Sequence, residues 1–309
     1  MEIDLIIIGG GAAGLSAAIQ GAKLGLETMV LERKNVGGKT IDAFVIEDYP
    51  GLPQISGAKL ISNMKKQALK NGVRIKELEE ALKIDTFNYK TRVVSSKDIY
   101  FVKAIIIATG GKYKKLGVPG EEEFIGKGVF YSVTSSGLSF KGKNFAVIGC
   151  GDMAVLNALT LVNLDANVHL ICSEDKLHVI DILKRKVSRS KIKVLWNTNV
   201  ISISGDSVVR KIILFEKETN KTIELEVDGV FVALGVEPES NIVRQIGVSV
   251  DENGYIIVDQ KQRTNVPGIF AAGTVTNGIL KVAVSIGEGT TAAISAYEYI
   301  RGVKIYGKN

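Results

Sequence analysis

The sequence has little of what marks several protein classes. Its 309 residues include two cysteines, five prolines, one tryptophan and two histidines. Two cysteines exclude a disulfide scaffold and suit a reducing compartment. No apolar run reaches membrane-spanning length, and no basic lead-in precedes the short apolar run at the N-terminus. We therefore expect a cytoplasmic protein without a signal peptide or a membrane partner.

Charge and histidine give no sign of particular partners. The net charge of +6 is spread along the chain without a basic–aromatic stripe, so we expect no nucleic-acid partner. His169 and His178 are isolated and lack ligand spacing, which predicts structural roles and no metal site. We interpret the densest basic run, residues 112–115, as part of a solvated linker over 112–120. The chain length fits one large or two medium domains.

What the sequence does contain is a glycine-rich turn at its start. Four branched apolar residues at 5–8 predict a buried strand, and a helix over about 13–24 follows. Gly9 and Gly11, between the strand and the helix, and Gly14, in the helix, fit G-x-G-x-x-G. These glycines allow a tight turn, backbone approach to a pyrophosphate and close helix–strand packing. The N–H groups at the helix N-terminus would face the same anion.

An acidic residue follows at the spacing that such a site requires. Residues 28–31 predict a second strand, and it ends in Glu32, eighteen positions after Gly14. A carboxylate there can accept both ribose hydroxyls of an adenosine. Strand, helix, strand and terminal acid together predict a dinucleotide site, rather than a glycine-rich turn that binds nothing.

The middle of the chain repeats this pattern. After a predicted strand, Gly149, Gly151 and Ala154 give G-x-G-x-x-A, and a helix and another strand follow. Eighteen positions after Ala154, where the first copy has Glu32, the second has Cys172. The shared spacing predicts two Rossmann-like units in one α/β chain.

Other segments complete the predicted secondary structure. Buried strands with glycine exits are expected at 104–111, 229–235 and 266–273. A hairpin is expected at 208–217 with 222–227. Two further helices are expected at 56–69 and 281–299.

The two cysteines should lie at the C-terminal ends of neighbouring parallel strands. Cys150 and Cys172 could come within disulfide range, or remain small buried side chains, which is the interpretation we prefer. We expect Asp152, inside the second glycine turn, to be the N-cap of the helix rather than a ligand.

Over its whole length the chain resembles the thioredoxin reductase family of flavoproteins. The resemblance rests on the order and spacing of Gly9/Gly11/Gly14 with Glu32, Gly37-Gly38, Tyr49-Pro50-Gly51, Ala108-Thr109-Gly110, Gly149/Gly151/Ala154, Ala271-Ala272-Gly273 and Gly287/Gly289. It implies an α/β fold of two Rossmann-like, three-layer ββα domains, the second inserted in the first. It also implies FAD, NAD(P)H and a homodimer. We expect an FAD domain at 1–115 and 238–309 and an NAD(P)H domain at 116–237.

The resemblance implies which residues surround the cofactors. Around FAD these are Gly9, Gly11, Ala12, Ala13, Gly14, Glu32, Arg33, Gly37, Gly38, Lys39, Asp48, Thr109, Gly110, Gly273, Thr274, Lys281 and Val282. Around the nicotinamide cofactor they are Gly149, Gly151, Asp152, Met153 and Ala154.

The chain departs from the family where the family keeps its redox residues. Family members carry C-x-x-C followed by Asp, and the corresponding positions here are Ser132, Ser135 and Ser136. A serine hydroxyl has no accessible two-electron redox couple, so thiol–disulfide exchange cannot run at this segment. We therefore expect no catalytic side chain there and no reduction of thioredoxin by the family mechanism.

The cofactor sites also depart from the family. Residues 172–175, Cys-Ser-Glu-Asp, replace the basic residues that hold the 2′-phosphate of NADPH, which favours NADH or a fold that no longer holds the cofactor. At the flavin, Thr274 replaces an Asp, Lys39 a Gln, and Leu280-Lys281 an Arg-Gln pair. The two lysines could stabilise an anionic reduced flavin, or extend along the surface with their charges in water.

We predict an FAD-dependent NAD(P)H oxidoreductase that passes electrons to a non-dithiol acceptor. Oxygen, a quinone and a small electron carrier are the candidate acceptors. One alternative is a ferredoxin–NADP reductase of the thioredoxin-reductase-like type, although the chain ends too soon for the aromatic tail typical of those enzymes. The other alternative is a catalytically silent FAD-binding protein, which the altered second site favours.

Overall fold

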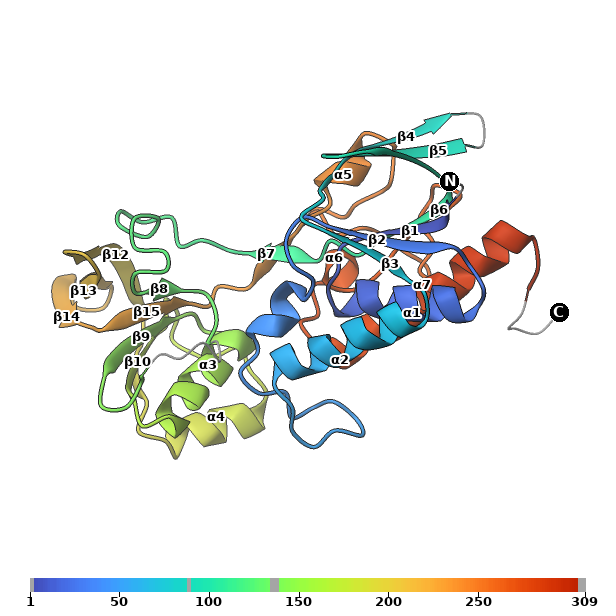
Figure 1. Ribbon diagram of the computed structural model, residues 1–309. Coiled ribbons are helices and arrows are strands. Elements are labelled where there is room, and N and C mark those ends of the chain that lie inside the picture. Colours follow the sequence, from blue (N-terminus) through green and yellow to red (C-terminus); the bar gives the residue numbers. More distant parts are fainter. Residues whose placement is uncertain (1–2, 88–89, 134–138, 305–309) are drawn as a thin grey trace. The chain divides into compact units, whose positions relative to one another are not determined.

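Residues 3–87, 90–133 and 139–304 are described by a computed structural model (Figure 1). Ser135 and Ser136 lie outside the described residues, and Ser132 lies within them. The chain divides into two compact units: unit 1 is Met1–Lys112 with Glu237–Asn309, and unit 2 is Tyr113–Val236. In the described part of the chain, no helix combines the length and apolar character needed to cross a bilayer.

Unit 1 is built on a seven-stranded sheet in the order β3-β2-β1-β6-β5-β4, with β17 paired to β6. Its strands are β1 Ile3–Ile8, β2 Thr28–Glu32, β3 Arg74–Glu77, β4 Ala81–Phe87, β5 Lys90–Ser95, β6 Ile99–Ile107 and β17 Ile269–Ala271. Its helices are α1 Ala12–Lys23, the 3₁₀ helix η1 Gly38–Asp42, α2 Gly57–Lys70, α5 Asn241–Arg244, α6 Thr274–Asn277 and α7 Val282–Arg301. Strands β1, β2, β3, β6 and β17 run parallel, whereas β4 and β5 add an antiparallel hairpin.

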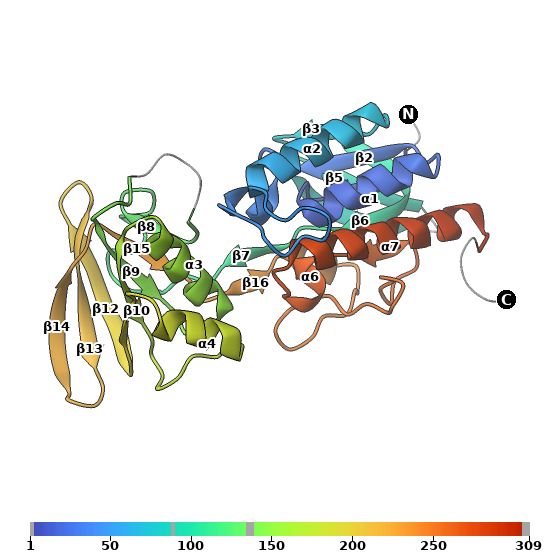
Figure 2. The ribbon, with the colours of Figure 1, turned by 90° about the horizontal axis from the view of Figure 1, so that it is seen from below.

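Both faces of this sheet are covered, which explains the unbroken apolar run in β1. Leu5 and Ile7 pack with residues of α1, α2 and α7 on one face. Figure 2 shows these three helices on the same side of the sheet. Ile6 and Ile8 point to the other face and pack with residues of the β4–β5 hairpin and the α5 region. Alternate residues of a strand face opposite sides of the sheet, so a strand buried on both faces must be apolar throughout.

Unit 2 has the same layers on a smaller scale. Its parallel sheet has the order β11-β10-β9-β15-β8, and β12-β13-β14 form a separate antiparallel sheet. The strands are β8 Val129–Phe130, β9 Asn144–Ile148, β10 Asn167–Ile171, β11 Lys193–Leu195, β12 Thr198–Gly205, β13 Val209–Glu216, β14 Lys221–Glu226 and β15 Gly229–Val232. The helices are α3 Asp152–Asn163 and α4 Asp181–Ser188. One face packs against the helices and the other against the antiparallel sheet.

The chain passes between the units in two short strands, β7 Gly111–Tyr113 and β16 Val236–Pro238, which pair as a two-stranded sheet. The units change at 112/113 and 236/237, a few residues from the expected changes at 115/116 and 237/238. The prediction of a solvated linker over 112–120 was wrong at its start, because the first two of those residues lie in β7. Lys112 pairs there with Glu237 at 3.6 Å.

The predicted α/β fold with two Rossmann-like units is confirmed, and most element predictions hold within a few residues. The predicted hairpin is β13 with β14. The predicted strand at 266–273 is shorter, since β17 covers only Ile269–Ala271. Five strands were not predicted, namely β3, β7, β8, β12 and β16.

Candidate dinucleotide sites

Four of the residues expected around FAD lie at one edge of the unit 1 sheet. Gly9 follows β1, Glu32 ends β2, Thr109 comes two residues after β6, and Gly273 comes two residues after β17. These four strands are parallel, so their C-terminal ends share an edge, which is where ligands bind in open α/β sheets.

Glycine is required in the first turn by close backbone contacts. Gly9 has φ +109°, and a Cβ on it would clash with the carbonyl oxygen of Ala108. A Cβ on Gly14 would clash with the carbonyl oxygen of Gly9, so α1 packs directly on the turn. A second glycine turn lies beside the first, since a Cβ on Gly38 would lie 3.3 Å from the Cα of Gly11. Two bare backbone segments therefore line the start of α1.

Glu32 is fixed against the first turn by two backbone donors. The N–H of Gly10 donates to Oε2 at 2.7 Å, and the N–H of Lys34 donates to Oε1 at 2.9 Å. The residue is half-buried. The end of β2 thus presents a rigid carboxylate whose remaining lone pairs can accept hydroxyl groups.

The start of α1 can hold an anion. Its N-cap is Gly11, which has no side chain to accept from the first N–H groups of the helix. Those groups have no partner within the helix and carry its positive dipole end. Ala12 and Ala13 occupy the first turn and add no charge, and a Cβ on Gly273 would lie 2.8 Å from the Cβ of Ala13. The residues present therefore fit the pyrophosphate and ribose of an FAD molecule.

Two acidic residues at this edge were missed by sequence reasoning. The carboxylate of Glu239 binds Arg33 at 2.7 Å, while its carbonyl oxygen accepts from Oγ1 of Thr109 at 2.7 Å. The carboxylate of Glu288 accepts the N–H of Gly273 at 2.7 Å. Only the second had a signal, because Glu288 stands between the two glycines of the Gly287/Gly289 motif.

The two lysines expected near the flavin differ in their surroundings. Lys281, the N-cap of α7, pairs with Asp48 at 2.7 Å, and both side chains are exposed. Lys39 lies in η1 directly after Gly38 and is half-buried. Burial lowers the pKa of Lys39 below its ordinary value, although Glu239 and Asp42 act in the opposite direction.

Three other expected residues stand at the starts of helices, with Gly37 as the N-cap of η1. Thr274 is the first residue of α6, with Gly273 as its N-cap, and Val282 is the first residue of α7. Gly37 has φ +145°, and its N–H donates to the carbonyl oxygen of Gly10 at 2.9 Å.

Unit 2 repeats the turn at the C-terminal ends of β9 and β10. Gly149 has φ +140°, and a Cβ on it would lie 2.5 Å from the carbonyl oxygen of Ala233. Ala154 is fully buried in the helix that follows. Asp152 was predicted to be the N-cap, which was wrong: Gly151 holds that position, and Asp152 is the first helical residue, with Met153 after it.

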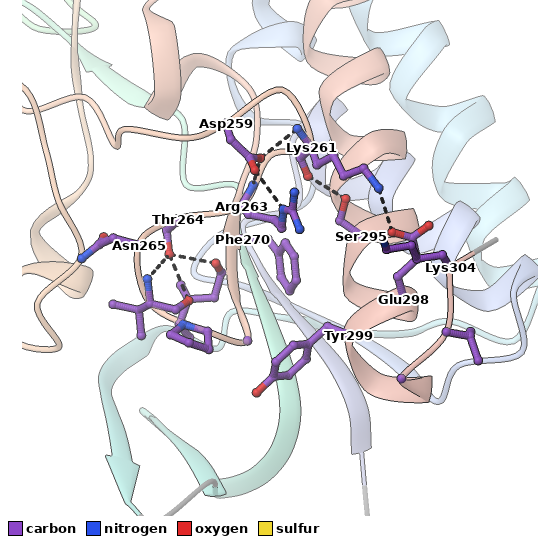
Figure 3. A pocket seen from close by; sticks show the side chains of 16 residues that line it. Asp259, Lys261, Arg263, Thr264, Asn265, Phe270, Ser295, Glu298, Tyr299 and Lys304 are labelled. Atoms are coloured by element: carbon purple, nitrogen blue, oxygen red, sulfur yellow. Dashed lines mark hydrogen bonds and ion pairs between the residues drawn. The ribbon is translucent and has the colours of Figure 1, made fainter. Parts of the chain in front are cut away.

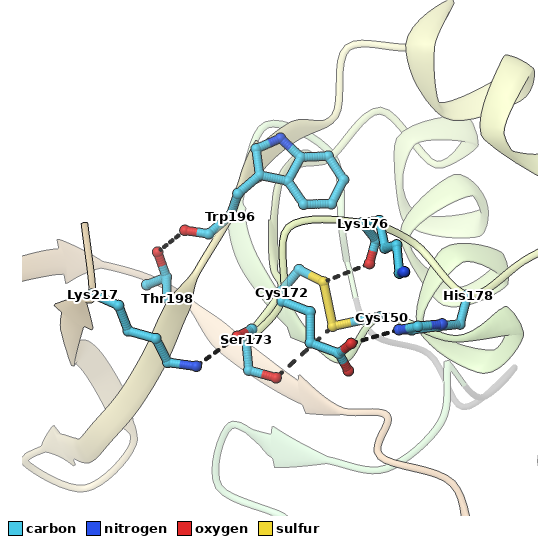
Figure 4. The surroundings of a disulfide bond; sticks show 9 residues. Cys150, Cys172, Ser173, Lys176, His178, Trp196, Thr198 and Lys217 are labelled. Carbon is cyan, nitrogen blue, oxygen red and sulfur yellow. Dashed lines mark hydrogen bonds and ion pairs between the residues drawn. A yellow bond between two sulfur atoms is a disulfide. The ribbon is translucent and has the colours of Figure 1, made fainter.

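The two cysteines of the chain are bonded to each other in this unit. Cys150 and Cys172 form a disulfide with 5.1 Å between their Cα atoms (Figure 4). This corrects our preference for separate buried thiols. Cys150 is half-buried in the glycine turn, and Cys172 is fully buried directly after β10.

One of the two histidines of unit 2 also differs from expectation. His178 is not isolated, because its ring binds Glu174 at 2.6 Å and its backbone N–H donates to the carbonyl oxygen of Cys150 at 2.8 Å. His169 is half-buried in β10, and burial lowers its pKa, with Lys193 adding to the effect.

A pocket of about 590 Å³ lies elsewhere in unit 1, between α7 and the segment before β17 (Figure 3). None of the residues expected around FAD lines it. Two ion pairs lie within its lining, Lys261 with Glu298 at 3.1 Å and Arg263 with Asp259 at 2.9 Å.

The comparisons with known proteins cover almost the whole chain. Residues 3–289, which include both glycine turns, match the pyridine nucleotide-disulphide oxidoreductase family. The chain belongs to this family. It is 37% identical over 302 residues to the thioredoxin reductase of Treponema pallidum, covering 97% of each chain. It is 34% identical over 303 residues to the "34.2 kDa protein in rubredoxin operon" of Clostridium pasteurianum, covering 97% of this chain and 98% of the relative.

Solved structures agree with this membership. The thioredoxin reductase of Lactococcus lactis in its FR conformation superposes with a TM-score of 0.90 at 32% identity, covering 97% of this chain and all of that one. The thioredoxin reductase of T. acidophilum gives 0.89 at 34% identity, covering 96% and 98%. The protein is thus a thioredoxin reductase-like flavoprotein oxidoreductase, and membership of the family implies FAD and NAD(P)H as its cofactors.

Proposed function

We propose that the protein passes electrons from NAD(P)H, with NADH preferred, through FAD to an acceptor that is not a dithiol. Oxygen, a quinone or a small electron carrier would serve as the acceptor. Bound FAD would supply the two-electron chemistry, and the chain would supply position and charge. Unit 1 would hold FAD, unit 2 would hold the nicotinamide cofactor, and the protein would be a homodimer.

One observation carries the proposal: the only two cysteines are bonded to each other within the glycine turn and strand end of unit 2. Where the resemblance expects a cysteine pair and an acid, the sequence has serines, of which Ser132 is described and Ser135 and Ser136 are not. No sulfur is therefore available at that segment to accept electrons from the flavin.

The chain's own residues would hold FAD by the contacts already described. Glu32, fixed by the N–H groups of Gly10 and Lys34, would accept ribose hydroxyls. The start of α1 beyond Gly11 would hold the pyrophosphate. The half-buried ammonium of Lys39 would favour negative charge on the reduced ring.

Acidic residues after β10 support the preference for NADH. Glu174 and Asp175 are both exposed, and a carboxylate close to a 2′-phosphate would repel it. Glu174 pairs with His178, which fixes its position without removing its charge.

The test uses purified protein with FAD, pretreated with a dithiol that is then removed. Anaerobic mixing with NADH should bleach the flavin absorbance, and NADPH should do so more slowly. Oxygen or a quinone should then restore the absorbance, whereas added thioredoxin should not. Reduction of thioredoxin that Cys150→Ser abolishes would refute the proposal. Absence of bleaching with both nucleotides would instead favour a catalytically silent FAD-binding protein.

A further inference from the structure

The disulfide of unit 2 occupies two positions that have clear counterparts in unit 1. Cys150 stands between the first two glycines of its turn, as Gly10 does, and Cys172 stands directly after β10, at the position that matches Glu32. In unit 1 the pair is joined by a hydrogen bond of 2.7 Å from a backbone N–H to a carboxylate. In unit 2 the corresponding pair is joined by a covalent bond.

The presence of Cys172 in place of a glutamate removes the hydrogen-bond acceptor on which an adenosine ribose would depend. Glu32 is half-buried and keeps lone pairs for a ligand, whereas Cys172 is fully buried and its sulfur is bonded to Cys150. A disulfide sulfur carries no charge and is a poor acceptor. The bond also spans the space between the glycine turn and the strand end, where the ribose lies in a Rossmann-like unit.

The segment after Cys172 has three backbone contacts that do not involve sulfur, beside the contact of the Cys172 sulfur with the carbonyl oxygen of Lys176 at 3.5 Å. The N–H of His178 donates to the carbonyl oxygen of Cys150 at 2.8 Å, and Nζ of Lys217 donates to the carbonyl oxygen of Ser173 at 2.7 Å. The N–H of Asn197 donates to the carbonyl oxygen of Glu174 at 3.1 Å. Breaking the disulfide would therefore separate the sulfurs while the loop keeps its place, so both redox forms can be folded.

Access to the two sulfurs is unequal. Figure 4 shows the residues around them. Cys150 is half-buried, with the exposed Ser173 hydroxyl 4.0 Å from its sulfur, whereas Cys172 has no exposed surface. An incoming thiolate would attack the sulfur of Cys150, and Cys172 would be the leaving group.

We propose that Cys150 and Cys172 form a reversible redox site that decides whether unit 2 binds a dinucleotide. This rests on the proposed function, in which unit 2 holds NAD(P)H. The bonded form excludes the adenosine ribose, and the reduced form admits it. The reductant is a dithiol: one thiolate attacks Cys150 and the Cys150–Cys172 bond breaks, with Cys172 leaving as a thiolate that takes a proton. The second thiol of the reductant then displaces Cys150, so that two electrons pass to the cysteines and the reductant becomes a disulfide.

The test compares the two forms of the FAD-loaded protein. One sample is treated with diamide and the other with dithiothreitol, and both are freed of reagent under nitrogen. Alkylation with mass detection should count no free thiols in the first and two in the second. The emission of Trp196, the only tryptophan of the chain, should differ between them, because its neighbours bind the backbone of Cys172.

Binding of NAD⁺ and NADP⁺ is then measured by calorimetry. Reduction should lower the dissociation constant of at least one of them tenfold or more. Cys150→Ser and Cys172→Ser should each bind like the reduced wild type after either treatment, and two variants are used in case one does not fold. A double variant, Cys150→Gly with Cys172→Glu, copies unit 1 and should bind irrespective of treatment.

The outcomes separate this proposal from the function on which it rests. Equal binding in the two forms would overturn the redox site and leave NAD(P)H as the donor. Two free thiols after diamide would overturn it as well. No binding in either form, or in any variant, would overturn both the redox site and the proposed donor.

Discussion

Units 1 and 2 share a backbone plan and differ at the residues that would touch a ligand. Each has a parallel sheet with helices on one face and antiparallel strands on the other. Each places a glycine turn directly after one strand, β1 or β9, and the residue that would face a ribose at or directly after the end of the next helix-linked strand, β2 or β10. In unit 1 that residue is Glu32 and in unit 2 it is Cys172. The repeat conserves the geometry that forms a dinucleotide site, while the chemistry of recognition is set by very few side chains.

The last position of the glycine motif is a second point of difference. Gly14 has no room for a Cβ, because the carbonyl oxygen of Gly9 would meet it. Its counterpart, Ala154, has a Cβ and is fully buried. Helix α1 must therefore pack more closely on its glycine turn than α3 packs on the turn of unit 2. Substitutions at Gly14 and Ala154 test this difference.

Gly14→Ala should have a larger effect than the matching change in unit 2. The new Cβ would force the turn and α1 apart, which should cost about 3 kcal/mol or more and release FAD. The reverse change in unit 2, Ala154→Gly, should cost only about 1 kcal/mol, through helix propensity. Thermal unfolding and the FAD content of the purified protein measure both. Similar losses for the two variants would contradict the difference in packing.

Glu32→Ala should come next. It removes the acceptor of the Gly10 N–H and the proposed ribose contact, so FAD affinity should fall about 10- to 100-fold. Titration of flavin-free protein with FAD gives the affinity. Glu27→Ala is the matched control, since Glu27 precedes the same strand and pairs with Arg74 at 3.2 Å. An unchanged affinity in Glu32→Ala would show that this carboxylate does not touch the cofactor.

Unit 1 has Lys39 and Lys281 among the residues expected around FAD, whereas unit 2 has Glu174 and Asp175 after β10, and the effect of the two lysines can be tested at the flavin. Lys39→Gln should make the flavin midpoint potential more negative by about 20–40 mV, where about 30 mV is a tenfold change for two electrons. Lys281→Gln should shift it less, because Lys281 is exposed and paired with Asp48. Lys23→Gln, at the opposite end of α1, is the control. No shift in either lysine variant would mean that neither charge acts on the flavin.

The smallest effect concerns a carboxylate behind the second glycine turn of unit 1. Glu77 accepts from Lys65 at 2.7 Å and from the N–H of Val36 at 2.8 Å, and these hydrogen bonds, the lysine's first, lower its pKa below 4.5. A lowered folded-state pKa stabilises the protein above pH 4.5, and the stabilisation is lost as the pH falls through the folded-state value.

Glu77→Gln should therefore lower the melting temperature at pH 7 by about 1–3 °C, a small value because the pair is partly solvated. The gap to wild type should narrow as the pH falls below 4.5. Melting curves across this range, with Glu80→Gln as an exposed control, provide the measurement. A gap that widens in acid would reverse the sign of the argument.

Local patterns predicted most buried strands well, because β1, β6, β9, β15 and β17 are each followed by a glycine within three residues. They failed where strands carry charge or lie at an edge, as β3 does with its sequence Arg-Ile-Lys-Glu. Contacts across long sequence separations were also missed: Glu239 reaches Arg33, and Glu288 binds Gly273. The sequence predicted that Cys150 and Cys172 lie at the ends of neighbouring strands, but it did not predict that their sulfurs are bonded.

The two short strands that connect the units bear on how unit 1 could be obtained without unit 2. Since β7 and β16 are neighbours, the inserted unit leaves and re-enters unit 1 at adjoining points, with Lys112 and Glu237 3.6 Å apart through their side chains. The insertion therefore interrupts unit 1 at one place and leaves its seven-stranded sheet intact. Replacing residues 113–236 with a tight turn is accordingly the simplest way to obtain unit 1 as an independent protein.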